Sequence, residues 1–161
     1  MFYPKLSDWV DDAVDSHEEY MRKLIQDFIL LKSNTCMRFG EIRNLKWNMV
    51  KTKKEEGQNL VWCELPSEIC KNKKYREFWS RGGNYLDRIK RYSNFTHKDH
   101  FVFSHPKFDR PLARPTFYKY WKQLMEFSGF DELEKDLSYY SLRHFGITAR
   151  LLAGVPIYNI S

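Results

Sequence analysis

Residues 35–47 read Thr-Cys-Met-Arg-Phe-Gly-Glu-Ile-Arg-Asn-Leu-Lys-Trp, and an amphipathic segment leads into them. The apolar side chains of that segment recur with helical spacing, at Tyr20, Leu24, Phe28 and Leu31. This spacing predicts a helix over about residues 16–33, and a second, shorter helix is predicted over about residues 40–45. Arg38 is then placed just ahead of the second helix.

Two β-like runs follow, at residues 60–65 and 75–80, with a lysine-rich stretch between them. They predict a small antiparallel sheet whose turn or strand end carries the lysines. Residues 85–92 are predicted to be helical. A further helix that ends at Gly129 is predicted from the buried-type spacing of Phe117, Trp121, Leu124 and Met125. The expected fold class is α+β, mainly helical with a small antiparallel sheet, in a single domain over residues 1–161.

The last predicted helix carries Arg143 in its first turn. Ser141 is its expected N-cap. Leu142, Phe145 and Leu152 are expected to form its apolar side. Gly154 and Pro156 are expected to end it. A cation beside free helix N–H groups opposes the helix dipole, so Arg143 needs either a carboxylate partner or a bound phosphate. Pro156 also suits the first position of another helix.

Composition excludes several classes of protein. The three cysteines, Cys36, Cys63 and Cys70, are far apart and odd in number, which fits neither a secreted disulfide framework nor a zinc site. The N-terminus does not resemble a signal peptide, and the longest apolar run, residues 28–31, is too short to span a bilayer. We expect a reducing, cytoplasmic setting and no membrane.

The formal net charge of +6 is concentrated in three basic clusters, which we name by their order in the chain. The first cluster is Lys51, Lys53 and Lys54. The second cluster is Lys71, Lys73, Lys74 and Arg76. The third cluster is Arg88, Lys90 and Arg91. Each alone is compatible with an ordinary solvated surface, but three such clusters around one short segment favour contacts with the phosphates of double-stranded DNA.

Three motifs resemble the tyrosine recombinases, the phage integrase family. Residues 35–47 resemble the first box of that family, T-G-x-R-x-x-E-L-x-x-L-x-W. Residues 140–144, Tyr-Ser-Leu-Arg-His, with Ala153-Gly154-Val155 downstream, resemble the second box, H-x-L-R-H followed by A-G-V. Residues 71–76, Lys-Asn-Lys-Lys-Tyr-Arg, resemble the hairpin that carries the family's catalytic lysine. The resemblance extends over about residues 5–161.

The resemblance implies cleavage of DNA by a tyrosine, through a 3′-phosphotyrosine link that is rejoined without metal or cofactor. Arg38 and Arg143 would neutralise the non-bridging phosphate oxygens, and Lys71 would protonate the leaving 5′-oxygen. Tyr140 would donate a hydrogen bond to the phosphate. Two residues would have supporting roles. His144 occupies the position of the histidine that follows the arginine in the second box, and Glu41 would either orient Arg38 or form an ordinary surface pair with it. The second cluster and the first would contact DNA.

The sequence departs from the family pattern at several positions. Tyr140 stands where the family has histidine or lysine, and Cys36 stands where it has glycine. The family's nucleophilic tyrosine lies well beyond the second box, and Tyr158 is too close to Arg143 to fill that role. We therefore expect residues 1–161 to be a truncated catalytic domain, without the N-terminal DNA-binding domain and the tyrosine segment, that oligomerises on DNA when full length.

Two other functions fit parts of the sequence. The first is a non-catalytic DNA-binding protein that keeps the recombinase fold. The second is a metal-dependent nuclease. One large nuclease class carries an acidic residue two positions before a lysine, and no lysine of this sequence has one. The best metal-like group is His97, Asp99 and His100, with His105 nearby, and a polar loop is the more common explanation for such a group. We predict no metal site.

Overall fold

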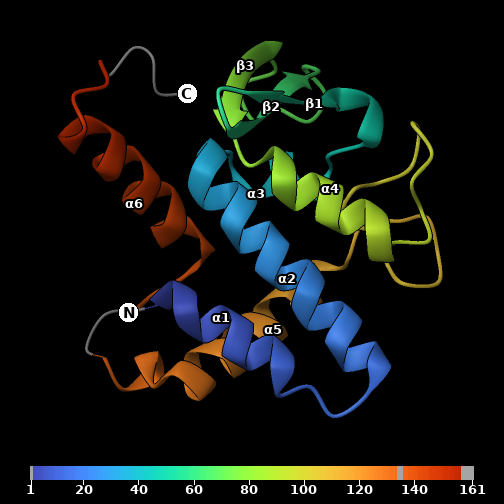
Figure 1. Cartoon of the computed structure of the whole chain (residues 1–161), viewed down its shortest axis with the longest axis vertical. Coiled ribbons are helices and arrows are strands. Elements are labelled where there is room, and N and C mark those ends of the chain that lie inside the picture. Colours follow the sequence, from blue (N-terminus) through green and yellow to red (C-terminus); the bar gives the residue numbers. More distant parts are fainter. Residues whose placement is uncertain (1, 134–135, 157–161) are drawn as a thin grey trace.

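Helix α2 (Ser16–Thr35) runs through the centre of the molecule, and the other elements pack around it (Figure 1). The computed structural model describes residues 2–133 and 136–156. The remaining helices are α1 (Phe2–Asp11), α3 (Phe39–Arg43), α4 (Gly83–Tyr92), α5 (Arg114–Ser128) and α6 (Tyr139–Leu152). Two short 3₁₀ turns are Trp47–Met49 and Phe130–Glu132, and the strands are β1 (Val50–Glu55), β2 (Gln58–Leu65) and β3 (Arg76–Arg81). The α+β prediction is confirmed.

Both ends of α2 are fixed by local chemistry. The Asp15 carboxylate accepts a hydrogen bond from the Glu18 N–H at 2.8 Å, which caps the first turn. At the other end Cys36 adopts a left-handed conformation with φ of 56°. Glycine adopts this conformation at no steric cost, which is why a glycine is the usual helix stop. The chain then turns sharply into α3.

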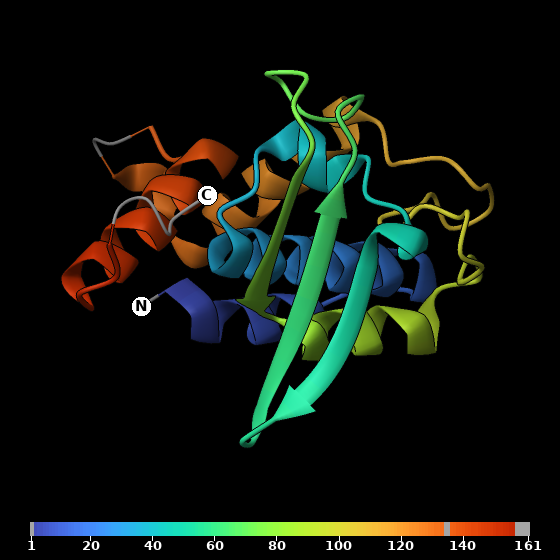
Figure 2. The same cartoon turned by 90° about the horizontal axis from the view of Figure 1, so that it is seen from above.

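The three strands form an antiparallel sheet in the order β1-β2-β3 (Figure 2). One face packs on α2 and α4 through buried Val61 and Cys63. The opposite face carries the cross-strand pair Trp62 and Trp79, with ring centroids 5.1 Å apart. Strand β1 was not predicted from the sequence, because five of its six residues are exposed and show no apolar alternation. Helix α1 was also missed.

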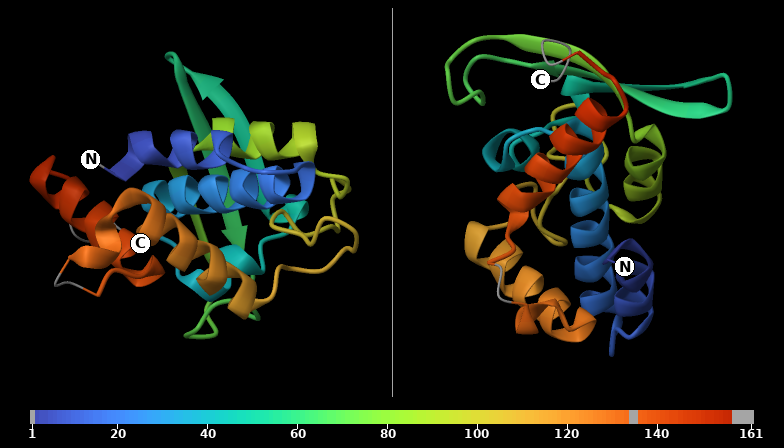
Figure 3. Two further views of the ribbon diagram at one scale, coloured as in Figure 1. Left: turned by 90° about the horizontal axis from the view of Figure 1, so that it is seen from below. Right: turned by 90° about the vertical axis from the view of Figure 1, so that its left-hand side faces the viewer.

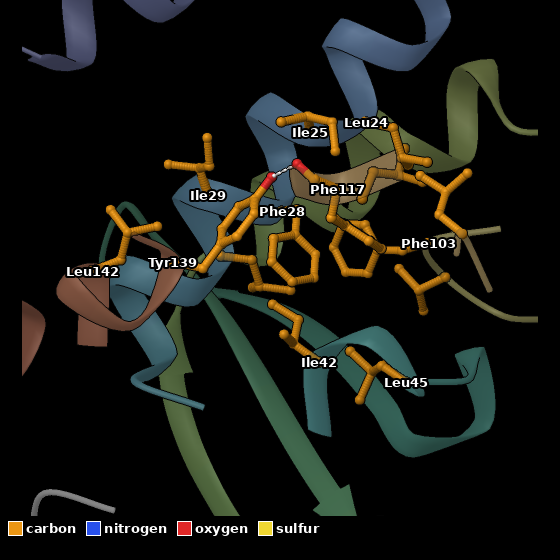
Figure 4. Packing of buried hydrophobic residues seen from close by; sticks show 14 of the residues in the cluster. Leu24, Ile25, Phe28, Ile29, Ile42, Leu45, Phe103, Phe117, Tyr139 and Leu142 are labelled. Carbon is orange, nitrogen blue, oxygen red and sulfur yellow. Dashed lines mark hydrogen bonds between the residues drawn. The ribbon is translucent and has the colours of Figure 1, made fainter. Parts of the chain in front are cut away.

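Aromatic side chains from α2, α5 and α6 meet in the core (Figure 4). Phe28 lies 4.5 Å from Phe117 between ring centroids, and the Tyr139 hydroxyl donates to the Phe117 carbonyl at 2.7 Å. The prediction that Phe117, Trp121, Leu124 and Met125 are core residues is confirmed. No helix in the described part of the chain is both long and apolar enough to cross a membrane.

Helix α6 differs from its prediction in three ways. It begins at Tyr139 after Ser138, whose N–H donates to the Ser141 hydroxyl at 3.0 Å, so Ser141 lies inside the helix. Arg143 is therefore its fifth residue and not part of its first turn. Phe145 and Leu152 are exposed, whereas Leu142 and Gly146 are buried and Gly146 lies against Ser33 and Cys36. Helix α6 packs beside the end of α2 (Figure 3). The predicted helix after Pro156 lies outside the described residues.

Candidate active site

A pocket of about 480 Å³ lies between α3, α6 and the loop that joins β2 to β3. All four predicted catalytic residues line it: Arg38, Lys71, Tyr140 and Arg143. These residues come from three separate parts of the chain, and 105 positions separate the two arginines (143 − 38). The remaining lining residues are Lys32, Phe39, Tyr118, Ser138 and Tyr139. Four of the nine side chains are basic and none is acidic, so the pocket is suited to an anion.

Glu41 does not line the pocket, but its carboxylate binds arginines at the pocket. Its carboxylate is buried and accepts hydrogen bonds from the Arg38 N–H at 2.9 Å and from Arg38 Nη1 at 3.3 Å. Arg76 Nη2 donates to the same carboxylate at 2.8 Å. Only 2% of the Glu41 side chain is exposed, so the Arg38–Glu41 contact is not an ordinary surface pair. The carboxylate fixes the position of both guanidinium groups.

Arg143 has an unused hydrogen-bonding atom. Its Nη1 is buried and has no hydrogen-bond partner among residues 2–133 and 136–156. Burial and the neighbouring Arg38 lower the pKa of Arg143, while Glu41 opposes that effect. The carboxylate partner that a purely structural arginine requires is missing from its described surroundings. The second possibility, a bound phosphate, fits this geometry.

Three tyrosines line the pocket, and they differ in accessibility. The Tyr139 hydroxyl is buried and bonded to Phe117, and burial raises the pKa of Tyr139 well above its usual value. Tyr118 and Tyr140 are exposed, so their hydroxyls are available to a ligand. His144 is also exposed and packs edge-on against Tyr140, with ring centroids 4.5 Å apart, but it does not line the pocket.

A model of the phage integrase family matches residues 5–161. The chain belongs to the phage integrase family, the tyrosine recombinases. No curated protein matches the sequence. The motifs that led to this family in the sequence are those that meet in the pocket.

Solved structures of tyrosine recombinases share this fold. One is the XerH site-specific recombinase bound to difH substrate, in a pre-cleavage complex, with a TM-score of 0.67 and 19% identity. The match covers 98% of this chain and 43% of the XerH chain. The FLP recombinase–Holliday junction complex has a TM-score of 0.64 at 15% identity and covers 98% and 41%. The chain therefore spans less than half the length of these recombinases.

The first and second basic clusters of this tyrosine recombinase differ in their place along the sheet. Lys71, Lys73 and Lys74 lie on the β2–β3 loop at the pocket end of the sheet, whereas Lys53 and Lys54 lie near the opposite end (Figure 2). Arg76 is directed into the site by its bond to Glu41. Lys51 is exposed on β1 near the middle of the sheet.

The third cluster is partly structural. Arg88 Nε donates to buried Asp27 at 2.8 Å, and Tyr92 donates to the same carboxylate. Arg88 is therefore committed to holding α4 against α2. Of the histidines, His97 and His100 contact each other, with the His97 N–H donating to His100 Nδ1 at 3.0 Å. The described residues contain no group of three or more His, Cys, Asp or Glu side chains that could hold a metal ion.

Lys32 is the one basic residue of the pocket that was not predicted from the sequence. It lies four positions after Phe28, so it continues the i, i+4 spacing of Tyr20, Leu24 and Phe28, and a lysine at such a position was the available signal. Its side chain is buried, and Nζ donates to the Met37 carbonyl at 2.7 Å. Burial and the nearby Arg143 lower the pKa of Lys32 to about 8.

This lowered pKa predicts a pH dependence of stability. Between pH 8 and 10.5 the unfolded chain holds a proton on Lys32 that the folded chain has lost, so the free energy of unfolding rises with pH in this window. Over this window the free energy of unfolding of the wild type should rise by at most about 3 kcal/mol relative to that of Lys32→Met. Urea unfolding of both proteins from pH 7 to 10.5 measures it. Parallel curves for the two proteins would show that Lys32 has an ordinary pKa.

Proposed function

We propose that this chain is part of a site-specific DNA recombinase and binds double-stranded DNA with one backbone phosphate in the pocket. The observation that carries the proposal is the buried Nη1 of Arg143, which has no hydrogen-bond partner among the described residues and lies in the same pocket as Arg38, Lys32 and Lys71. A phosphodiester supplies the anionic oxygens that these donors lack. The solved structures that share the fold are complexes with a difH substrate and with a Holliday junction.

The proposed reaction divides the chemistry among the pocket residues. The hydroxyl oxygen of a tyrosine loses its proton to water and forms a bond to phosphorus, and the bond from phosphorus to the 5′-oxygen breaks. Arg38 and Arg143 stabilise the charge on the non-bridging oxygens in the transition state. Lys71, on the β2–β3 loop, gives its proton to the leaving 5′-oxygen. Tyr140 donates a hydrogen bond to the phosphate, where the family has a histidine or lysine.

The attacking tyrosine, we propose, comes from outside the described residues. Tyr139 cannot serve because its hydroxyl is buried and already donates to Phe117. Tyr140 lies on the helix that carries Arg143, and we assign it a binding role. Tyr158 lies outside the described residues. We also propose that the full-length protein oligomerises on DNA.

Salt dependence tests the DNA-binding part of the proposal. If the pocket and the β2–β3 loop contact several phosphates, affinity for a 20-bp duplex should fall about 100-fold as salt rises from 50 to 200 mM. Fluorescence anisotropy measures this. The double variant Lys73→Ala/Lys74→Ala should show a shallower dependence, whereas Lys122→Ala, which removes an exposed lysine of α5, should match the wild type. Affinity that is the same at both salt concentrations would contradict the proposal.

Cleavage in EDTA distinguishes a recombinase from a metal-dependent nuclease. The proposed mechanism draws its charge stabilisation from arginine and lysine side chains, so EDTA should leave strand cleavage unchanged when a segment that supplies the tyrosine is present. Loss of cleavage in EDTA and its return with Mg²⁺ would favour the nuclease. DNA binding without cleavage, even when a tyrosine segment is supplied, would favour the non-catalytic DNA-binding protein.

A further inference from the structure

Lys32 is a buried cation for which the fold itself provides little reason. It lies in the last turn of α2, with 1% of its surface exposed. Its ammonium group has three N–H donors and uses one, toward the Met37 carbonyl. Among the residues that the structure describes, Lys32 forms no ion pair. The side chain nevertheless lines the pocket that contains Arg38 and Arg143.

The surroundings of Lys32 disfavour its charge in the free protein. The ionisable groups that face it are Arg143 on α6, Glu41 on α3 and Cys36 at the end of α2. Arg143 repels the ammonium, and Glu41 is already bonded to Arg38 and Arg76. The Cys36 thiol is neutral because burial raises its pKa. An apolar side chain of similar length, such as methionine, would avoid the cost of burying a charge.

We propose that Lys32 is an additional phosphate-binding residue of the pocket, whose ammonium form is stabilised by the arriving phosphodiester. The inference rests on the proposed function, because it takes the pocket ligand to be a backbone phosphate. Two free N–H donors then meet phosphate oxygens, and the anion offsets the repulsion between Lys32 and Arg143. The burial cost in the free protein is recovered when DNA binds.

The proposal gives DNA binding a defined pH dependence. In the free protein the pKa of Lys32 is about 8, and a bound phosphate raises it. Below pH 8 the lysine already carries its proton, so affinity changes little. Above pH 8 binding must take up a proton, and affinity falls by up to tenfold for each pH unit. From pH 7 to pH 9 we expect a loss of about tenfold.

Direct titration of Lys32 is the first test, and it uses the wild-type chain. With ¹³C-labelled lysine, the Lys32 Cε signal is identified by its loss in Lys32→Met. Its pKa should be near 8 in the free protein and at least about one unit higher with saturating dimethyl phosphate, which stays a monoanion over this pH range. A pKa that is the same with and without the ligand would overturn the proposal.

Affinity measurements separate this inference from the proposed function. Dimethyl phosphate and a 20-bp duplex are titrated into the wild type, Lys32→Met, Arg143→Ala and Lys23→Met, the last removing another lysine of α2. Lys32→Met should bind about tenfold more weakly at pH 7 and lose the pH dependence, while Lys23→Met should match the wild type. If Arg143→Ala weakens binding and Lys32→Met does not, the role of Lys32 is wrong. If neither variant weakens binding, the phosphate pocket itself is wrong.

Discussion

Replacing Arg143 with alanine should reduce formation of a covalent protein–DNA adduct by at least about 100-fold. The guanidinium has a buried Nη1 without a described partner, and it lies beside Arg38 in a pocket that lacks acidic side chains. Charge that develops on phosphate oxygens in the transition state then has only one arginine to stabilise it. The assay uses a nicked duplex with the recognition site and a segment that supplies the tyrosine, followed by a denaturing gel.

The control for this variant is Arg110→Ala, because Arg110 is an exposed arginine that belongs neither to the pocket nor to the three basic clusters. It should form the adduct at the wild-type rate. Circular dichroism should show that Arg143→Ala is folded, since the side chain makes no described ion pair. An adduct that forms equally well without Arg143 would contradict the proposed clamp. An adduct formed by residues 1–161 alone would show that a tyrosine of this chain attacks the phosphate, and Tyr140→Phe and Tyr158→Phe would then identify it.

Replacing Gly146 with valine should lower the free energy of unfolding by more than about 3 kcal/mol. A Cβ at this position would lie 2.5 Å from the Ser33 carbonyl oxygen and 2.7 Å from Cys36 Sγ, and backbone cannot move aside as a flexible side chain can. Helix α6 would have to leave the end of α2, where Arg150 also bonds to the Asn34 carbonyl. Arg143, on the same helix, would move with it.

Thr148→Val is the control, because Thr148 is exposed on the same helix and already β-branched, so the change introduces valine into α6 without adding bulk. Urea unfolding should place it within about 0.5 kcal/mol of the wild type. Gly146→Val should also weaken binding of dimethyl phosphate when it is measured below its melting temperature. Unchanged stability in Gly146→Val would show that α6 is not held against α2 as the structure describes.

Much of the secondary structure was predictable because it depends on local periodicity. The spacing of Phe117, Trp121, Leu124 and Met125 indicated both a helix and its buried side, and Gly129 ended it. Strand β1 was not predictable in this way, since hydrogen bonds to β2 stabilise it rather than an apolar face. The start of α6 was misplaced by three residues because Ser138 and Ser141 are both good N-caps.

The sequence by itself determined the family and the identity of four pocket residues, because residue types at short spacings carry the motifs around Arg38, Lys71 and Arg143. Only the tertiary structure decided which charges are free. It bonded Arg76 to Glu41 and Arg88 to Asp27, left Nη1 of Arg143 without a described partner, and buried Lys32 at the pocket wall. The physical reason is that the environment of a charge depends on contacts between α2, α3 and α6, which no local pattern encodes.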